Sequence, residues 1–238
     1  MQNIYNYDYQ ELENKLIELG EKKYRTRQIW EWLYLKKVSS FKEMTNLSKE
    51  LISKLEENFA FPNIKILKKQ ESKLTNKYLF ELFDGNFIEA VLMRHDYGLS
   101  ICVSSQVGCN MGCRFCASTL HGMVRNLTPG EMLAQTYYIN DLLAKEGQKV
   151  DTIVIMGSGE PLNNYDNVLD YIRLLHEDYC LGMSYRSITL STSGIVSNIY
   201  KLAAEELPIT LSISLHAPED ELRSELMPIN RKYPLADV

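Results

Sequence analysis

The sequence predicts an α/β protein in which a small helical N-terminal part with a β-hairpin extension precedes a parallel sheet in open or barrel form. Two observations support this prediction. Apolar spacing is helical over residues 8–57, and from Leu99 onward short apolar strands alternate with helices. Strands that alternate with helices pack as a parallel sheet with helices on its faces. We therefore expect an accessory domain over residues 1–94 and a core domain over residues 95–238.

The N-terminal part is expected to contain three helices and two strands. The first helix ends near Gly20, because glycine suits a helix end. The second spans residues 27–35 and the third spans residues 47–55, opened by Ser48 or Asn46 as N-cap. Residues 77–94 then alternate like two strands around an Asp-Gly-Asn turn, which predicts a hairpin.

The core is expected to contain four strands with helices between them. The strands are predicted at residues 99–107, 151–159, 187–194 and 209–217. The helices are predicted from Thr128 to Leu143, from Asn164 to His176 and from Ile195 to Ala204. Thr128-Pro-Gly-Glu131 supplies an N-cap, a first-turn proline and a capping-box glutamate for the first of these helices.

Distinctive residues follow each of the four predicted strands. They are Cys109, Cys113 and Cys116 after the first strand, Gly157-Ser-Gly159-Glu160-Pro161 after the second, Ser191-Thr-Ser-Gly194 after the third, and Ser214-Leu215-His216 at the end of the fourth. In parallel α/β sheets the functional groups lie at the carboxyl ends of the strands. We therefore expect these segments to form one site.

Composition limits the classes of function. The net charge of −5 argues against loose electrostatic binding to nucleic acid. No apolar run approaches the roughly 20 residues of a membrane span, and the acidic N-terminus is wrong for a secretory signal, so we expect a cytoplasmic protein without membrane contact. Two Lys- and Arg-rich stretches, residues 21–37 and 65–77, are either solvated faces or, given the aromatic residues in the first, an RNA surface.

Three interpretations of the C-x3-C-x2-C spacing compete. Cys109, Cys113 and Cys116 could bind zinc together with His121. Cys113 and Cys116 could form a redox pair, which leaves Cys109 without a role. The three thiolates could instead hold a [4Fe–4S] cluster with one iron open to a small molecule. The third interpretation accounts for the missing fourth ligand.

At this point the motifs resemble a known family. The spacing C-x3-C-x2-C after the first strand resembles the radical S-adenosylmethionine (radical SAM) superfamily. Five motifs sharpen the resemblance to the RNA adenosine C2 methyltransferases called RlmN: CVSSQVGCNMGCRFCAS, MGSGEPLNN, ITLSTSG, ISLHAP and LMPINRKYP. The KKYRTRQIWEWLY segment is similar to the small accessory domain of that family. The related Cfr type, which methylates adenosine C8, typically has Ala where this chain has Pro161.

The resemblance implies a fold and a set of site residues. The fold is a (βα)6-type radical SAM barrel, of which this sequence shows four strands. The cluster ligands are Cys109, Cys113 and Cys116. The S-adenosylmethionine contacts are Gly159, Glu160, Ser191, Ser214, Leu215 and His216. Glu89 matches a proton acceptor, and Cys102 matches a catalytic cysteine that closes a disulfide to release the product; from their positions alone, both would be ordinary strand residues.

The resemblance also implies a reaction and partners. S-adenosylmethionine methylates an enzyme cysteine, a second molecule supplies a 5′-deoxyadenosyl radical, and the activated methyl group is transferred to C2 of adenosine in 23S rRNA and tRNA. A flavodoxin or ferredoxin would donate electrons to a monomeric enzyme. The methyl-carrying cysteine and the last strands have no counterpart here, so we expect this polypeptide not to complete methylation. A C8 methyltransferase, a radical enzyme with a substrate other than RNA, and a non-catalytic zinc-containing RNA-binding protein remain the alternatives.

Overall fold

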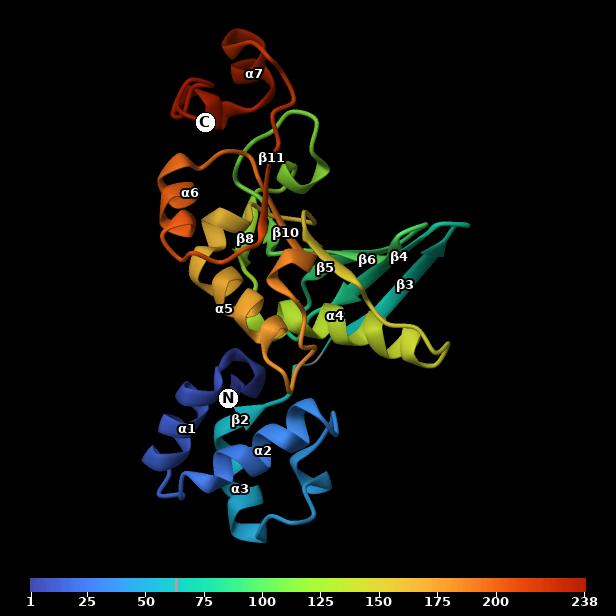
Figure 1. The fold of residues 1–238 in the computed structure, drawn as a ribbon, viewed down its shortest axis with the longest axis vertical. Helices are drawn as coiled ribbons and strands as arrows, with labels where there is room; N and C mark the ends of the chain where they lie inside the picture. Colours follow the sequence, from blue (N-terminus) through green and yellow to red (C-terminus); the bar gives the residue numbers. More distant parts are fainter. Residues whose placement is uncertain (63) are drawn as a thin grey trace.

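The computed structural model describes residues 1–62 and 64–238. Three helices form the N-terminal part: α1 (Tyr9–Glu18), α2 (Tyr24–Tyr34) and α3 (Lys49–Asn58). Asp8 and Ser48 accept hydrogen bonds from the first turns of α1 and α3, which confirms Ser48 as the predicted N-cap. Two short parallel strands, β1 (Gln2–Asn3) and β2 (Phe59–Ala60), close this part, which lies at one end of the molecule (Figure 1).

One mixed sheet of seven strands forms the rest of the framework, in the order β11-β10-β9-β6-β5-β4-β3. Its parallel strands are β6 (Gly98–Val103), β9 (Thr152–Ile155), β10 (Ile188–Thr192) and β11 (Thr210–Ile213). Its antiparallel strands are β3 (Lys65–Glu71), β4 (Thr75–Glu81) and β5 (Phe87–His95). Each parallel strand lies beside the preceding one, which confirms the predicted α/β class with a parallel sheet.

The sequence does not predict every strand correctly. The basic pattern of residues 65–71 predicts no strand, but the segment forms β3, an edge strand that is exposed along most of its length. The strand expected at 99–107 is broken: β6 ends at Val103, and β7 (Gln106–Gly108) pairs instead with β8 (Met123–Asn126) in a separate ribbon. The remaining predicted core strands are shorter than expected, because polar loop residues at their ends leave the sheet. The division at residue 94 stays a prediction, and β5 and β6 pair directly across it.

Four helices complete the fold: α4 (Pro129–Ala144), α5 (Tyr165–His176), α6 (Val196–Ala203) and α7 (Asp220–Leu226). The capping box of Thr128 and Glu131 at the start of α4 is confirmed. Ile101, Ile153 and Leu190 of neighbouring strands are at most 1% exposed and belong to the same apolar core as the inner residues of α4 and α5. Among the described residues, no helix is long and apolar enough to cross a membrane.

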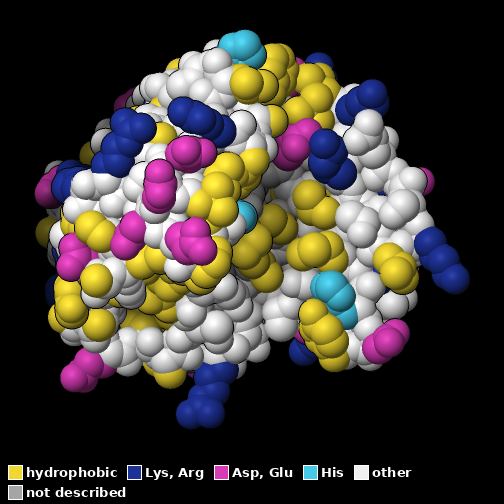
Figure 2. All heavy atoms as spheres, turned by 90° about the horizontal axis from the view of Figure 1, so that it is seen from above, with side chains coloured by type: hydrophobic (Ala, Val, Ile, Leu, Met, Phe, Trp, Pro, Cys, Tyr) yellow, Lys and Arg dark blue, Asp and Glu magenta, His cyan; other side chains and the backbone are white. Residues whose placement is uncertain are grey.

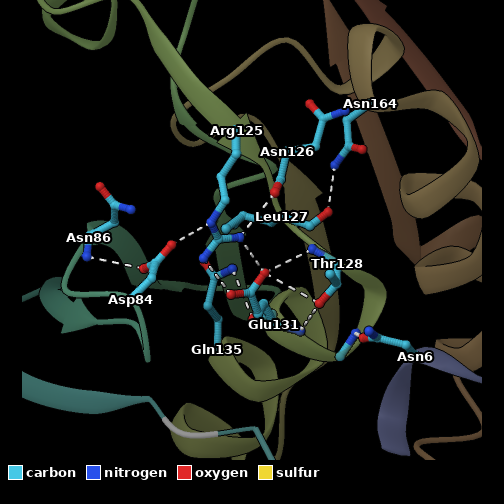
Figure 3. A network of polar contacts seen from close by, with 11 residues as sticks. Asn6, Asp84, Asn86, Arg125, Asn126, Leu127, Thr128, Glu131, Gln135 and Asn164 are labelled. Carbon is cyan, nitrogen blue, oxygen red and sulfur yellow. Dashed lines mark hydrogen bonds and ion pairs between the residues drawn. The ribbon is translucent and has the colours of Figure 1, made fainter. Parts of the chain in front are cut away.

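A partly buried ion-pair network ties the β4–β5 turn to the core (Figure 3). Arg125 of β8 donates to Asp84 of the turn at 2.6 Å and to both carboxylate oxygens of Glu131 at 2.8 Å. Glu131 is 4% exposed, so its charge is compensated by a bidentate guanidinium contact. The hydrogen bond from Arg125 lowers the pKa of Asp84 to about 2. The turn is therefore held against α4 by charge-assisted hydrogen bonds.

Asp84→Asn is expected to lower the free energy of unfolding of the apoprotein by about 1–2 kcal/mol near neutral pH. Because the folded-state pKa is depressed, the contribution of Asp84 is complete above the ordinary aspartate pKa of about 3.9. It is lost as the pH falls through about 2. Urea unfolding of both proteins across this range should show the difference shrinking in acid. Asp96→Asn, at an exposed turn, is the matched control, and a difference that persists at low pH would contradict the assignment.

Candidate cofactor-binding site

The carboxyl ends of β9, β10 and β11 and the cysteine loop, which follows β6 and β7, meet at one pocket of about 510 Å³. Its wall includes most of the residues that the sequence singled out: Cys109, Cys113, Cys116, Gly159, Glu160, Ser191, Ser214, Leu215 and His216. The cysteine loop and α7 lie at this end of the molecule in Figure 1. Figure 2 looks onto the same end and shows a hollow bordered by hydrophobic side chains. The predicted convergence of the strand ends on one site is thus present in the geometry.

The three cysteines lie on a loop that its own backbone closes. At its base Cys109 N–H donates to the Gly122 carbonyl at 3.2 Å, where β7 and β8 pair. Within the loop Thr119 Oγ1 donates to the carbonyls of Cys113 and Cys116 at 3.2 and 2.9 Å. These bonds turn the chain so that three thiols from eight consecutive residues face one pocket. Cys109 and Cys113 are buried, and Cys116 is partly exposed.

The electrostatics of this loop favour neutral thiols until a positive group binds. Burial raises the pKa of Cys109, and burial together with the neighbouring thiols raises the pKa of Cys113 to about 11. Glu160 adds a further negative neighbour to both thiols. A metal centre that binds here must therefore supply enough positive charge to displace the thiol protons.

The three thiols line the pocket but do not surround a single position that one metal ion could occupy. Within the part of the chain that the structure describes, no three Cys, His, Asp or Glu side chains are placed to hold a single metal ion. His121 is exposed and lies outside the residues that line the pocket, so the proposed Cys3His zinc set is not assembled. A polynuclear cluster can take each thiolate on a different iron, and the loop fits that arrangement better than it fits tetrahedral zinc.

The turn after β9 brings a carboxylate into the pocket wall. A Cβ on Gly157 would lie 2.7 Å from Ser104 N, and one on Gly159 would lie 2.6 Å from the Gln106 side chain. Gly159 also has a φ of 109°, which L side chains rarely adopt. Two glycines are therefore needed for the turn to pack against the chain between β6 and β7.

Glu160 is 3% exposed, and its carboxylate accepts four hydrogen bonds. Thr192 Oγ1, Ser193 N and Ser193 Oγ each donate at 2.7 Å, and Leu162 N donates at 3.0 Å. None of the described lysine, arginine or histidine side chains forms an ion pair with it. A buried carboxylate with only neutral donors keeps a net negative potential, and it is therefore suited to a cationic ligand such as an ammonium group.

The third and fourth strands supply the opposite wall. Ser191 Oγ and Ser214 Oγ are 3.1 Å apart, in hydrogen-bonding distance across β10 and β11. His216 has a φ of 58° and its ring lies 4.4 Å from that of Phe115 in the cysteine loop. Hydroxyl groups and an imidazole at this edge can bind the polar groups of a nucleoside and a carboxylate.

Cys102 and Glu89 lie on the sheet beside the pocket and not in its wall. Cys102 pairs with Val91 of β5 and Val154 of β9, so the three share one face of the sheet. Glu89, two residues before Val91, lies on the same face and forms an ion pair with Lys77 at 2.8 Å. Burial raises the pKa of Cys102. The structure thus brings these two residues to one face that continues, through Met156, into the pocket.

Several tethering residues were missed by the sequence analysis. Gln106 accepts from Glu160 N–H at 2.8 Å and donates to Asn126 at 2.8 Å, and Ser104 Oγ bridges Ser158 N and the Glu89 carbonyl at 2.9 and 2.6 Å. Both are fully or almost fully buried polar residues in SSQV. One feature of the sequence could have revealed them: polar residues follow directly after an apolar strand, at positions where further apolar residues would be expected if the strand continued.

The parallel strands of this sheet carry three thiols and a buried carboxylate at their carboxyl ends. This arrangement is typical of the class of proteins that hold a thiolate-bound inorganic centre beside a small cationic ligand. Residues 103–238 match the model of the Radical SAM superfamily. Residues 2–60 match the model of the ribosomal RNA large subunit methyltransferase N-terminal domain. The chain therefore belongs to the radical SAM superfamily.

Individual relatives agree with this assignment and confirm the resemblance drawn from the motifs. The chain is 52% identical over 233 residues to two proteins named probable dual-specificity RNA methyltransferase RlmN, from Staphylococcus haemolyticus and Staphylococcus aureus; the match covers 98% of this chain and 64% of each relative. A solved radical SAM methyltransferase from Sphaerobacter thermophilus superimposes with a TM-score of 0.92 at 39% identity, covering all of this chain and 70% of that one. The chain thus spans a little under two thirds of the length of the RlmN relatives.

Gly159→Ala should destabilise the apoprotein more than Gly147→Ala does. Both positions have positive φ, so each alanine is expected to cost about 1–2 kcal/mol from backbone strain. Only the alanine at position 159 meets a close neighbour, Gln106, which should add about 1–3 kcal/mol. Urea unfolding of the two variants measures the difference. Equal losses would show that the turn has room for a side chain.

Proposed function

We propose that this protein acts as an RNA adenosine C2 methyltransferase of the RlmN type, on 23S rRNA and tRNA. The observation that carries the proposal is the convergence of three thiols and the buried carboxylate of Glu160 on one pocket. Membership of the radical SAM superfamily implies that the resident cofactors are a [4Fe–4S] cluster and S-adenosylmethionine. The RlmN relatives support RNA as the substrate.

Cys109, Cys113 and Cys116 are proposed to hold the cluster as thiolates. Three protein ligands leave one iron free for the amino acid part of S-adenosylmethionine. When bound, the two cofactors supply a 5′-deoxyadenosyl radical, a species able to activate unreactive C–H bonds. The closed loop orients the thiols, and the burial of Cys109 and Cys113 limits the access of water.

Gly159 and Glu160 are proposed to bind the amino group of S-adenosylmethionine. The glycine lets backbone approach the ligand, and the carboxylate, held by four neutral donors, pairs with the ammonium. The ribose and carboxylate are assigned to the opposite wall: Ser191, Ser214, Leu215 and His216. The paired hydroxyl groups of the two serines and the imidazole, all in the pocket wall, support this assignment.

Glu89 is proposed as the proton acceptor and Cys102 as the cysteine that closes the product-releasing disulfide. Their shared sheet face beside the pocket supports both roles. Lys77 Nζ, at 2.8 Å from a Glu89 carboxylate oxygen, would orient that carboxylate. The Cys102 thiol would have to lose its proton to act as a nucleophile.

The N-terminal part, residues 1–94, is proposed to bind RNA in the cytoplasm. Lys36 lies over the Trp32 ring at 3.4 Å, and Arg25 lies over the half-exposed Tyr24 ring at 4.9 Å. Aromatic faces next to cations suit unpaired bases and phosphates. A monomeric enzyme reduced by a flavodoxin or ferredoxin completes the proposal.

The direct test is the nucleoside content of RNA in cells with and without the intact gene. Loss of 2-methyladenosine from 23S rRNA and tRNA, restored by the gene, is the expected result. Loss of 8-methyladenosine instead would assign the Cfr-type reaction. Unchanged methyladenosines would refute the proposal. Complementation with Cys113→Ser should fail, whereas Cys180→Ser, a buried thiol outside the pocket, should restore the modification.

Cys113→Ser is also expected to abolish cluster assembly. Anaerobically reconstituted protein should contain about four iron and four sulfide per chain, and the variant should contain little of either, because a serine oxygen replaces one of three thiolates. Cys180→Ser should keep wild-type content. Iron and acid-labile sulfide assays measure the cluster content. Wild-type protein that contained zinc and no sulfide would refute the cluster assignment.

Glu160→Gln should weaken S-adenosylmethionine binding by about tenfold or more, because the amide is neutral and cannot pair with an ammonium group. The amide nitrogen would also face one of the donors that now bond the carboxylate. Isothermal calorimetry on reconstituted protein measures the affinity. Glu177→Gln, on a surface loop away from the pocket, is the control. Equal affinities for Glu160→Gln and wild type would remove Glu160 from the binding site.

A further inference from the structure

Arg223 of α7 is a fully buried arginine next to the cofactor pocket. Its side chain is 0% exposed, and it is among the largest fully buried side chains of the molecule. Nε donates to the Leu215 carbonyl at 3.1 Å, Nη2 donates to the Ser193 carbonyl at 2.7 Å, and Nη1 donates to Asn230 Oδ1. One guanidinium therefore joins the segment after β10, the segment after β11 and the turn that follows α7.

This cation has no carboxylate within ion-pair distance among the described residues. Burying a charge without an ion pair is costly, and burial lowers the pKa of the Arg223 guanidinium. Asn230 is itself fixed by bonds from its amide nitrogen to Asp220 and Ser224. The network is thus anchored on both sides, and it uses the rigid donor geometry that distinguishes arginine from lysine.

The first connection leads to Glu160. Ser193, whose carbonyl Arg223 holds, donates from its N–H and from its hydroxyl to the same carboxylate oxygen of Glu160, at 2.7 Å each. The following residue, Gly194, has a φ of 105°, and a Cβ there would lie 3.3 Å from Arg223 Nη2. Glu160 thus holds the peptide before the Ser193 Cα and Arg223 holds the peptide after it, so the backbone of Ser193 is fixed on both sides.

The second connection leads to His216. Arg223 holds the Leu215 carbonyl, and the next residue has the left-handed φ of 58° that a non-glycine residue adopts only when its surroundings enforce it. The end of α7 is in turn attached to the cysteine loop, because Arg114 N–H donates to the Leu226 carbonyl at 2.9 Å. Both walls of the pocket therefore depend on the placement of α7.

We propose that Arg223 is a positioning residue that holds Ser193 and Leu215 so that Glu160 and His216 face S-adenosylmethionine in the binding geometry. The inference rests on the proposed function, since it takes S-adenosylmethionine as the ligand. Arg223 touches neither the ligand nor the reacting atoms. Its effect is on affinity for the amino acid end of the cofactor, whose ammonium is assigned to Glu160 and whose carboxylate is assigned to the wall that includes His216.

Arg223→Lys keeps the charge but cannot reach three acceptors in three directions. In reconstituted protein it should weaken S-adenosylmethionine binding about tenfold. Binding of 5′-methylthioadenosine, which has the nucleoside but lacks the amino acid part of S-adenosylmethionine, should change less than about threefold. Arg231→Lys, on the exposed side of the neighbouring turn, is the matched control and should bind both ligands like the wild type.

Calorimetric titrations of both ligands, well below the unfolding midpoint of each variant, decide the question. A selective loss for S-adenosylmethionine supports the proposal. Unchanged affinity overturns it, and so does an equal loss for both ligands, because that result indicates general loosening of the pocket. If Arg223→Lys does not fold, Asn230→Ala removes one of the three contacts. A selective loss of about threefold for that variant then supports the proposal, and an unchanged affinity overturns it. Wild-type protein that binds neither ligand refutes the proposed function itself.

Discussion

The burial of the Glu160 carboxylate is the constraint on which the rest of the site depends. Removing an ion from water costs several kcal/mol unless hydrogen bonds replace the lost solvation. Here four neutral donors do so, and no cation of the described residues is in ion-pair contact with the carboxylate. Three of these donors come from the end of β10, a segment more than 30 residues further along the chain. The carboxylate can therefore exist in this position only when β9 and β10 are paired in register and both glycines of the turn are present.

Strand register extends this constraint across the sheet. Cys102 pairs with Val154, which pairs with Thr189, which pairs with Thr210, so these side chains form one row on the pocket side of the sheet. Residues two positions later in the last three strands form the next row, at the edge of the pocket. A one-residue slip of any strand would turn its row to the helical side. The chemistry of the rim is thus fixed by the same pairing that builds the apolar core.

The sequence predicted what local patterns determine and missed what distant partners determine. Apolar spacing and the capping box located α4 well, and the cysteine spacing with the polar strand ends located the pocket. Strand β3 escaped because Lys68 and Lys69 occupy both faces of an edge strand, so no alternation marks it. The structural roles of Ser193, Gln106 and Arg223 were missed because they depend on contacts 30 or more residues away, which no local pattern encodes.

The electrostatic balance of the pocket explains why its ligand should be cationic. Three thiols and one carboxylate share a space of about 510 Å³, and Arg223, the buried cation nearby, directs its donors to carbonyls and an amide and not into the pocket. Deprotonating the thiols without added positive charge would place several anions together, which the raised pKa of Cys113 opposes. Iron bound by the three thiolates would relieve this repulsion, and the ammonium group proposed to bind Glu160 would relieve it at the carboxylate. The two cofactors would therefore compensate the negative charge of the same pocket, and we expect each to favour the binding of the other.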